Sequence, residues 1–343
     1  LYACYETAEE LDIQRKMLAS RGLPPIYKRA TEEQNKKFIA EGRKPHWRFA
    51  LNDEELAWDD LIRGHTHFKA THMSDPVLIR EDGVPLYTLA SVVDDGEMGV
   101  THIIRGEDHV SGSAVQIQIF QALGYRAPAF AHMALLKTKD GEMSKRIGGN
   151  DIRALREAGI LPMAVNSLLS RIGTSDAIEP FTEMQPLIDS FDFKKFGRAP
   201  ANYDVAELEK LNEKLLHQLP FAAVKDRLPF ADETFWMSVR ANVANLTEAK
   251  QWWDIVQGSV IGGQGSEDKE FLAQAATLLP PEPWDETTYD AWLAAVKPTT
   301  TRKGKELFLP IRKALTGLEH GPELKKLLPL LGRDKSTARL IQH

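Results

Sequence analysis

The sequence contains very little cysteine, since Cys4 is the single thiol among 343 residues. One cysteine cannot form an internal disulfide, and it leaves no cluster of thiolates for a structural zinc ion. We therefore expect no bound zinc. A chain with so few thiols also fits a reducing compartment, so we expect a cytoplasmic protein.

Long apolar runs and an excess of one charge are also missing. No apolar run approaches the ~18 residues that a spanning helix needs, and no secretory segment is visible, so a membrane role is unsupported. The formal net charge of −6 excludes a nonspecific polycation, although a basic track is enough to bind a nucleic acid. The length of 343 residues predicts two to three domains of about 100–200 residues each.

A turn signal separates two apolar segments after residue 76. Asp82-Gly83 lies between Val77–Ile79 and the run that starts at Val84, which is typical of a hairpin. Leu89–Val93 is almost continuously apolar, as a strand buried on both faces is, and Asp94-Asp95-Gly96 would end it. We therefore predict a strand over Leu89–Val93.

A strand, a helix and a second strand are predicted next. The strands are Gly99–Ile104, which stops at the charged group beginning with Arg105, and Phe130–Leu136. The helix between them has a serine cap (Ser111 or Ser113) and a glycine stop (Gly124). This order is typical of half of an open parallel sheet, in which ligands bind beyond the carboxyl ends of the strands. Arg105 would lie at such an end.

The order and spacing of these segments resemble the bacterial glutamyl-tRNA synthetases, which are class I aminoacyl-tRNA synthetases. The matching runs are Gly-Val-Pro-Leu-Tyr-Thr-Leu-Ala from Gly83, Val-Val-Asp-Asp-Gly-Glu-Met-Gly-Val-Thr-His-Ile-Ile-Arg-Gly-Glu-Asp-His from Val92, Phe-Ala-His-Met-Ala-Leu-Leu from Phe130 and Met-Ser-Lys-Arg from Met143. A match to the family's terminal anticodon-binding signature, from Arg302 to Gly317, extends the resemblance to the end of the chain.

Two departures from the family pattern shape our expectations. The family's His-Ile-Gly-His type tetrapeptide, which helps bind ATP, is absent and the chain opens at Leu1. We therefore expect an N-terminally truncated piece that does not form glutamyl-adenylate alone. In addition, Glu142 replaces the lysine that commonly begins the family's cationic loop, which leaves Lys145 to hold phosphate. Without the family context, that loop would be an ordinary solvated basic turn.

The resemblance implies an α/β fold followed by an all-α part. The implied chain begins with the second half of a Rossmann-type catalytic domain, which carries an inserted acceptor-binding segment. A helical stem-contact region and an all-helical anticodon-binding domain follow. The implied boundaries are 1–75 for the insertion, 76–137 for the catalytic half, 138–212 for the Met-Ser-Lys-Arg loop and stem contact, and 213–343 for the anticodon-binding domain. Independently of the family, capping boxes at Thr7 and Thr31 predict two early helices, and helical periodicity persists from residue 213 onward.

The implied reaction is the ATP-dependent attachment of L-glutamate to tRNA(Glu) through glutamyl-adenylate, with Mg²⁺ held mainly by the phosphates and water. The family pattern assigns glutamate binding to Tyr87, Ser91 and Arg105, because a guanidinium matches a carboxylate. The residues implied for ATP binding are Glu107, Asp108, His109, Met143 and Lys145. Lys145 would also be catalytic, by neutralising the departing pyrophosphate, with Ser144 shaping the loop. The alternatives are a structural salt bridge for Arg105 and loop capping for Glu107, Asp108 and His109.

Contacts with tRNA are implied at both ends of the chain. The candidates are Lys36, Lys37, Arg43 and Lys44 for the acceptor arm, and Arg240 and Arg312 for the anticodon. An ordinary solvated helix face is the alternative for the first four. Two other patterns favour plain structural roles: His65 and His67 as solvated residues rather than metal ligands, and Trp252-Trp253 as core rather than a base-stacking pair.

Other functions remain open at this point. The chain could be a noncatalytic tRNA-binding protein derived from such a synthetase, which the coding sequence before Leu1 would decide. It could also be an enzyme that charges tRNA(Gln) as well, which aminoacylation of purified isoacceptors would decide. A glutaminyl-tRNA synthetase is disfavoured, because that relative has a β-rich anticodon domain and no strand periodicity occurs here. We expect a monomer.

By the complete enzyme we mean this chain with any residues that precede Leu1 in the natural protein. We predict that Lys145→Ala in the complete enzyme raises the activation free energy of adenylate formation by a few kcal/mol. ATP binding should weaken far less, because the ammonium meets charge that develops in the transition state. ATP–pyrophosphate exchange at varied ATP measures the rate of adenylate formation and the apparent affinity for ATP. The affinity for tRNA is the control and should not change. An equal loss in ATP binding with kcat unchanged would exclude the catalytic role.

Overall fold

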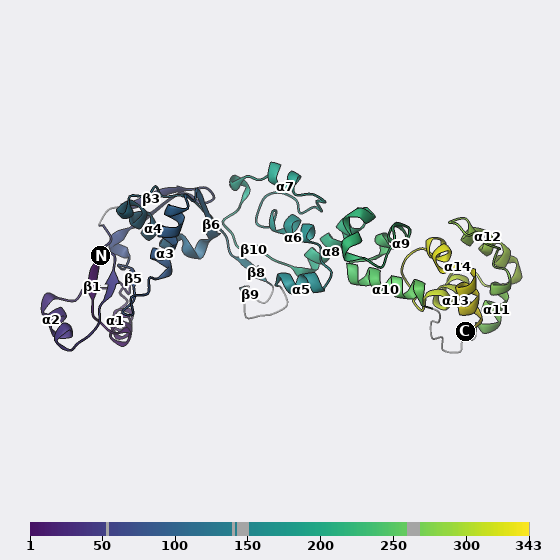
Figure 1. Cartoon of the computed structure of the whole chain (residues 1–343), viewed down its shortest axis with the longest axis horizontal. Helices are drawn as coiled ribbons and strands as arrows, with labels where there is room; N and C mark the ends of the chain where they lie inside the picture. Colours follow the sequence, from purple (N-terminus) through teal and green to yellow (C-terminus); the bar gives the residue numbers. More distant parts are fainter. Residues whose placement is uncertain (53–54, 139–140, 143–150, 259–267, 343) are drawn as a thin grey trace. The chain divides into compact units, whose positions relative to one another are not determined.

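The computed structural model describes residues 1–52, 55–138, 141–142, 151–258 and 268–342 (Figure 1). The chain forms two compact units. Unit 1 comprises residues 1–143, 173–176 and 192–203, and unit 2 comprises residues 144–172, 177–191 and 204–343. Within the described ranges, no helix is both long and apolar enough to span a bilayer. The predicted four-part division of the chain stays a prediction.

Unit 1 combines short sheets with helices. Its helices are α1 (Ala8–Ser20), α2 (Glu32–Ala40), α3 (Tyr87–Glu97) and α4 (Val110–Leu123), with a 3₁₀ turn η2 (Glu107–His109) before α4. Its strands are β1 (Tyr2–Cys4), β2 (His46–Arg48), β3 (Glu55–Asp60), β4 (Gly64–Lys69), β5 (Val77–Ile79), β6 (His102–Gly106), β7 (Ala129–Met133), β8 (Leu136–Thr138), β9 (Gly141–Glu142) and β10 (Ala201–Asn202). The sheets are ordered β1-β2-β5, β10-β8-β9, β3-β4 and β6-β7.

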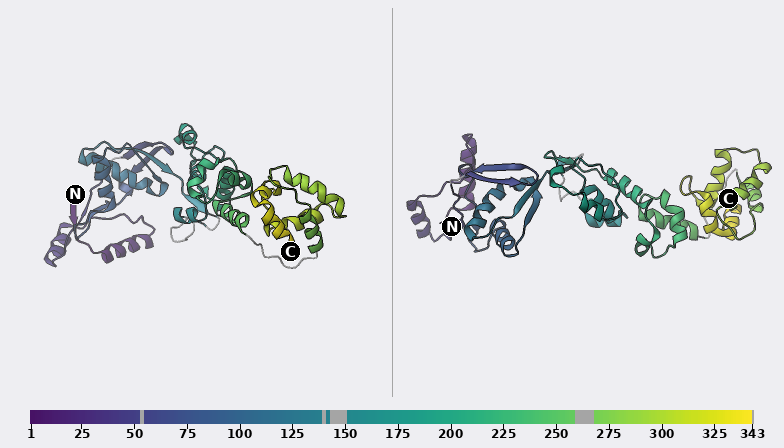
Figure 2. Two further views of the ribbon diagram at one scale, coloured as in Figure 1. Left: turned by 45° about the vertical axis from the view of Figure 1, so that its right-hand side comes forward. Right: turned by 90° about the horizontal axis from the view of Figure 1, so that it is seen from above.

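The pairing directions follow the length of each connection. β3 and β4 are joined by a short turn and pair antiparallel, and they run side by side in the view from above (Figure 2). β6 and β7 are joined through α4 and pair parallel. Parallel neighbours need such a crossover, because a tight turn reverses the chain direction. The predicted strand–helix–strand unit is therefore confirmed.

Both predicted capping boxes are confirmed. The Thr7 hydroxyl accepts from the Glu10 amide at 3.2 Å, while the Glu10 carboxylate accepts from the Thr7 amide at 2.8 Å. Thr31 and Gln34 repeat these bonds at the start of α2. Neither α1 nor α2 buries a side chain, so local capping contributes much of what fixes their ends.

The predicted strand over Leu89–Val93 is wrong, because these residues lie in α3. The turn at Asp82-Gly83 does form, but after one bridge between Ile79 and Pro85 the chain enters the helix. Val92 is fully buried there. Gly96, expected to end a strand, instead lies inside α3, where an added Cβ would come within 2.5 Å of the Tyr125 ring. Glycine at 96 thus allows the ring to pack against the helix backbone.

Two smaller expectations for this unit also fail. α4 begins at Val110, directly after η2, and neither predicted serine caps it; Gly124 does end it, in the left-handed conformation. The strand predicted to reach Leu136 stops at Met133, and Leu136 starts β8 in another sheet. The apolar core is the contact region of α3, α4, β5 and β7, with these buried residues: Leu78, Val92, Val115, Ile117, Ile119, Phe120 and Phe130.

The regular secondary structure in the described residues of unit 2 is entirely helical, which confirms the prediction for residue 213 onward. Its helices are α5 (Ile152–Glu157), α6 (Pro162–Leu169), α7 (Gln185–Asp189), α8 (Val205–Leu216), α9 (Glu233–Val239), α10 (Leu246–Gln257), α11 (Lys269–Thr277), α12 (Thr288–Val296), α13 (Lys305–Thr316) and α14 (Leu324–Ile341). Trp252 is buried, and Trp253 packs edge-on against Phe235 with ring centroids 5.1 Å apart. The core prediction for this tryptophan pair is therefore confirmed.

Asn212 connects three segments of unit 2. This side chain is fully buried on α8. Its Oδ1 accepts from the Leu161 amide at 2.9 Å, just before α6, and its Nδ2 donates to the Ala244 carbonyl at 2.7 Å, just before α10. The amide thus satisfies a buried N–H and a partly buried C=O at once, which no apolar side chain could do.

We predict that Asn212→Ala destabilises unit 2 by about 2–4 kcal/mol, because a buried N–H and a partly buried C=O both lose their partner. Urea unfolding monitored by circular dichroism measures the change. Glu213→Ala, on the exposed face of the same helix, is the matched control and should change stability by less than about 0.5 kcal/mol. Equal stability of the two variants would contradict the proposed role.

Candidate active site

The parallel pairing of β6 and β7 places Arg105 directly beside His132. Each residue lies one position before the end of its strand. The carboxyl ends of parallel strands share one edge of a sheet, and ligands of open α/β sheets bind at that edge. α4 follows β6 through η2 and brings Ser113 and Gln116 to the same edge.

The guanidinium of Arg105 is held from one side. Its Nη2 donates to the Ser113 hydroxyl at 2.7 Å and to the Gln116 Oε1 at 2.5 Å. Its Nη1 lies 3.5 Å from the Tyr87 hydroxyl, and that side chain is 61% exposed. Because Nη2 carries two hydrogens, both are used, and Nη1 is the nitrogen left to face solvent or a ligand.

Gln116 connects Arg105 to Ser91. Its side-chain amide accepts from Arg105 at one end and donates from Nε2 to the Ser91 hydroxyl at 2.8 Å at the other. Gln116 is buried, so its amide plane is fixed by these two bonds. The structure thus brings together Tyr87, Ser91 and Arg105, the three residues predicted to bind glutamate.

A buried acid and histidine lie behind Arg105. Asp60 Oδ2 is 2.5 Å from His132 Nδ1, and both side chains have no exposed surface. Burial acts to raise the pKa of Asp60, but hydrogen bonds from the Arg63, His132 and Ile62 amides and the His132 ring hold it below its usual value. Burial lowers the pKa of His132. The nearby Asp60 raises it, whereas the positive charges of Arg105 and Arg63 lower it further, and the result is a pKa below the usual value. The pair is therefore a carboxylate beside a neutral imidazole.

Sequence reasoning missed Asp60, Ser113, Gln116 and His132 as parts of this site. The signal for one of them was available, because His132 interrupts the otherwise apolar strand β7 near its carboxyl end. Polar groups at such positions are costly to bury unless they are paired. Their partners, however, are distant in sequence, and only the strand pairing reveals them.

The residues predicted to line the nucleotide side follow β6 on η2. Glu107 pairs with Arg63 at 2.8 Å, so it has a structural partner in the β3–β4 turn. Asp108 and His109 are exposed, and the His109 ring centroid lies 6.2 Å from that of Tyr87. The other residues predicted for ATP or catalysis, Met143, Ser144 and Lys145, lie outside the described part of the chain.

The cations predicted to contact the tRNA acceptor arm differ in their surroundings. Arg43 bonds the Glu10 carboxylate at 2.7 Å and the Glu41 carboxylate at 2.8 Å, so it ties the end of α2 to α1. A phosphate would have to compete with both carboxylates. Lys36, Lys37 and Lys44 are exposed, with Lys37 3.9 Å from Glu41. These lysines are the more accessible phosphate contacts.

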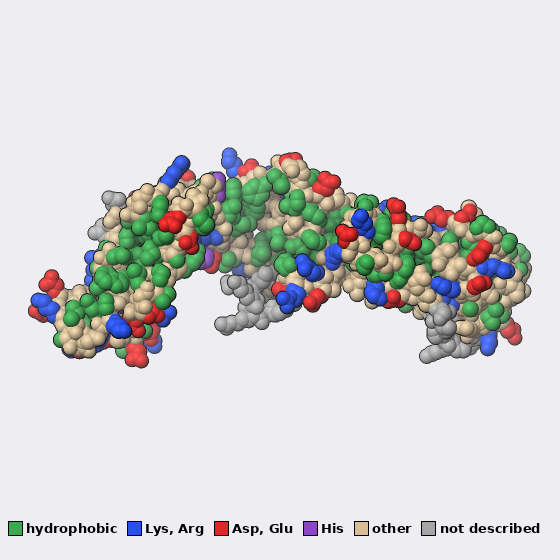
Figure 3. Space-filling model, viewed as in Figure 1, with side chains coloured by type: hydrophobic (Ala, Val, Ile, Leu, Met, Phe, Trp, Pro, Cys, Tyr) green, Lys and Arg blue, Asp and Glu red, His purple; other side chains and the backbone are tan. Residues whose placement is uncertain are grey.

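The two predicted anticodon contacts lie in unit 2. Arg240 Nη1 donates to the Leu219 carbonyl at 2.8 Å, next to the buried Trp236. Arg312 Nη1 donates to the Pro322 carbonyl at 3.0 Å. Arg312 also lines a surface cavity of about 340 Å³, together with Tyr289, Asp290, Phe308, Glu323, Leu324 and Lys325. On the face of unit 2 seen in Figure 3, acidic and basic side chains are interspersed.

Among the described residues, one group in unit 1 could hold a metal ion: the ligand atoms of Cys4, Glu6 and His46 lie within 4.8 Å of one another. The Tyr27 hydroxyl already bonds Cys4 Sγ at 3.3 Å and Glu6 Oε1 at 2.8 Å. Burial raises the pKa of Cys4, which disfavours the thiolate that a metal requires. His65 and His67 are not part of this group, and both are exposed.

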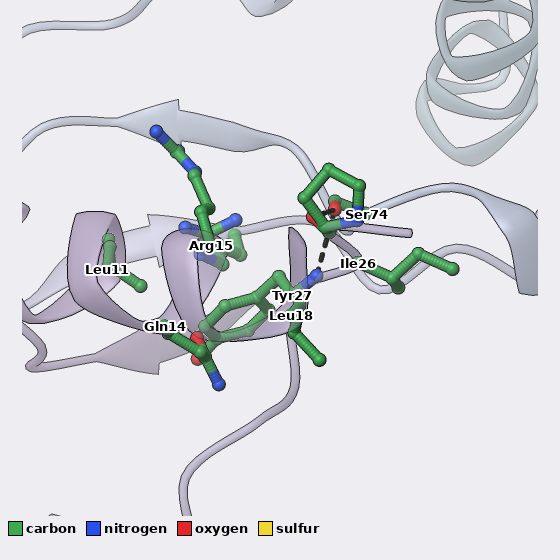
Figure 4. A pocket seen from close by; sticks show the side chains of 9 residues that line it. Leu11, Gln14, Arg15, Leu18, Ile26, Tyr27 and Ser74 are labelled. Atoms are coloured by element: carbon green, nitrogen blue, oxygen red, sulfur yellow. Dashed lines mark hydrogen bonds between the residues drawn. The ribbon is translucent and has the colours of Figure 1, made fainter. Parts of the chain in front are cut away.

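Tyr27 is held in place from two sides. Its amide donates to the Ser74 hydroxyl at 2.9 Å, beside a small cavity of about 40 Å³ under α1 (Figure 4). The Arg48 guanidinium carbon lies 3.8 Å over its ring. A cation bound at Cys4 and Glu6 would therefore face the buried charge of Arg48 and would have to displace a fixed tyrosine.

Two family models match the chain. The model described as "tRNA synthetases class I (E and Q), catalytic domain" matches residues 1–210, and the model described as "Anticodon binding domain" matches residues 263–343. Among curated relatives, glutamate–tRNA ligase 1 of Rhizorhabdus wittichii is 50% identical over 346 residues. Glutamate–tRNA ligase of Azospirillum brasilense is 50% identical over 351 residues. Each alignment covers 99% of this chain and 78% of the relative.

The fold is also similar to solved structures. The glutamate tRNA ligase from Elizabethkingia meningosepticum, crystallised in complex with its amino acid, superposes with a TM-score of 0.79 at 23% identity. The glutamate-tRNA synthetase from Elizabethkingia anophelis superposes with a TM-score of 0.78 at 24% identity. Both comparisons cover 99% of this chain and 78% of the other.

We predict that the purified chain holds less than about 0.1 zinc ion per molecule after incubation with zinc and desalting, because a structural zinc site needs four deprotonated, well-placed ligands. Elemental analysis by mass spectrometry measures the content. A content near one ion, lost in Cys4→Ser but retained in His72→Ala, would contradict the prediction.

Proposed function

The chain belongs to the class I tRNA synthetases of the glutamate and glutamine type, and we propose that it carries out the ATP-dependent attachment of L-glutamate to tRNA(Glu). The observation that carries this proposal is the 50% identity to a glutamate–tRNA ligase along 99% of the chain. The catalytic-domain and anticodon-domain matches confirm the α/β plus helical architecture that the resemblance implied.

The proposed reaction has two steps. The α-carboxylate of glutamate attacks the α-phosphate of ATP, which forms glutamyl-adenylate and releases pyrophosphate. A hydroxyl of the terminal tRNA ribose then attacks the activated carbonyl and releases AMP. Neither step needs a covalent bond to the protein, so positioning and charge stabilisation supply the catalysis.

Arg105 and Tyr87 are the proposed carboxylate-binding pair. Arg105 Nη2 is saturated by Ser113 and Gln116, so a bidentate fork from this arginine alone is not available. Nη1 and the Tyr87 hydroxyl, 3.5 Å apart, offer two donors from two residues instead. Both groups can donate a hydrogen bond. They therefore favour the side-chain carboxylate of glutamate over the side-chain amide of glutamine, whose NH₂ group would face a donor.

ATP is proposed to bind beside this pair, along Asp108 and His109, which are exposed after β6. Glu107 holds Arg63 through an ion pair, and we propose that it shapes the nucleotide side of the site from there. Met143, Ser144 and Lys145 complete the proposed nucleotide site, with Lys145 and Ser144 in the catalytic roles. Mg²⁺ would arrive with ATP and be held by its phosphates and by water.

tRNA is proposed to contact both units. Lys36, Lys37 and Lys44 are the exposed candidates for the acceptor arm, and Arg43 shapes that region through its two carboxylates. In unit 2, the cavity beside Arg312 combines a cation with the aromatic rings of Tyr289 and Phe308, a combination that suits an unstacked base. We also propose a cytoplasmic monomer; the single cysteine supports the reducing location.

Aminoacylation tests the function directly. The complete enzyme should charge purified tRNA(Glu) with glutamate, and parallel assays with tRNA(Gln) and with glutamine measure its specificity. Binding of tRNA(Glu) without charging would favour the noncatalytic alternative.

We predict that Arg105→Ala in the complete enzyme lowers kcat/KM for glutamate at least about 100-fold, because a charge-assisted partner of the substrate carboxylate is lost. Arg126→Ala, at an exposed position of the same unit, is the control and should leave kcat/KM unchanged. ATP–pyrophosphate exchange at varied glutamate measures both variants. Near-normal kinetics for Arg105→Ala would show that this arginine is structural.

A further inference from the structure

A continuous line of hydrogen bonds runs from Arg105 to Asp60. Arg105 Nη2 lies 2.7 Å from Ser113 Oγ, Ser113 Oγ lies 2.8 Å from His132 Nε2, and His132 Nδ1 lies 2.5 Å from Asp60 Oδ2. Ser113 is fully buried, and the Asp60 and His132 side chains are also fully enclosed. A cation therefore stands at one end of the line and a carboxylate at the other, with two neutral groups between them.

The chemistry of the two ends, together with the distances between the groups, sets the direction of the hydrogen bonds along this line. The Asp60 carboxylate only accepts, so the neutral His132 ring must carry its proton on Nδ1. His132 Nε2 is then an acceptor, 2.8 Å from the Ser113 hydroxyl and 3.5 Å from the Arg105 Nε–H that also donates to it. The Ser113 hydroxyl has a second acceptor in reach, the His109 carbonyl at 3.3 Å, but the shorter distance favours His132 Nε2. The Ser113 oxygen in turn accepts from Arg105, which only donates. All donors thus point from Arg105 toward Asp60.

Asp60 is held rigidly, so it can act as the fixed end of this line. Its Oδ1 accepts from the amides of Ile62, Arg63 and His132 at 2.9 to 3.2 Å. The Leu61 amide donates to the Phe130 carbonyl of β7 at 2.9 Å, which ties the turn after β3 to the adjacent strand. The fixed end of the line is therefore part of the backbone framework.

We propose that Asp60, His132 and Ser113 are positioning residues that hold Arg105 Nη2 and so present Nη1 to the carboxylate of glutamate. The identity of the carboxylate rests on the proposed function, whereas the direction of the protons does not. Ser113 is fully buried and its hydroxyl bonds Arg105 and His132, so it acts through the arginine and does not bind glutamate itself.

Nitrogen NMR of the histidine side chains tests the proton direction in this chain, without any substrate. His132, assigned by loss of its signal in His132→Asn, should show the neutral tautomer with hydrogen on Nδ1 at neutral pH. A ring with hydrogen on Nε2 alone, or on both nitrogens, would overturn the proposal.

Asp60→Asn provides a second test with a specific outcome. The amide oxygen can keep the three backbone N–H bonds, which leaves the NH₂ group facing His132 Nδ1. His132 must then accept there and carry its proton on Nε2, so the tautomer should switch. A folded Asp60→Asn protein whose His132 keeps the Nδ1 proton would show that Asp60 does not set the direction.

Kinetics of the complete enzyme test the positioning role. Ser113→Ala should raise KM for glutamate about tenfold and leave KM for ATP unchanged, because a charge-assisted bond that orients Arg105 is lost. Ser111→Ala, at an exposed position two residues earlier on α4, is the matched control and should change neither value. An equal rise in both KM values, or no rise, would overturn the positioning role. If the wild-type enzyme does not activate glutamate, the proposed function fails, while the NMR result still decides the proton direction.

Discussion

The candidate site depends on one buried negative charge, the carboxylate of Asp60. A charge with no exposed surface is stable only when hydrogen bonds replace the lost water, and Asp60 receives four, from three backbone amides and an imidazole. These bonds join the turn after β3 to β7. The same carboxylate therefore fixes both the backbone framework of the site and the ring that stands behind Arg105.

Local features of the fold were predictable from the sequence because they need only neighbouring residues. Thr7 and Thr31 cap α1 and α2, Asp151 caps α5, and Gly124 ends α4, each by bonds or backbone angles within a few positions. The strand–helix–strand order around α4 was also predictable, since apolar periodicity and turn residues mark all three elements. The resemblance added the identity of Tyr87, Ser91 and Arg105 as a group.

The errors have a different physical origin. Leu89–Val93 has an apolar pattern that suits either a buried strand or a buried helix, and the contact between Gly96 and the Tyr125 ring that accommodates the helix is invisible in the local sequence. Ser113 was taken for a cap because serine often caps helices, whereas its hydroxyl is used three residues into α4 to bond Arg105. Asp60 and His132 meet across 72 positions of sequence, so only tertiary pairing joins them.

The division of the chain into units is not a division of the sequence into halves. Residues 173–176 and 192–203 belong to unit 1, although residues on either side of both segments belong to unit 2. Within unit 1, the second segment supplies β10, which pairs with β8. A single cut after residue 143 would therefore leave the N-terminal fragment without a strand of its own sheet. Fragments designed for separate expression of the two units must therefore keep residues 173–176 and 192–203 with unit 1. A C-terminal fragment that starts at residue 204 contains no unit 1 segment.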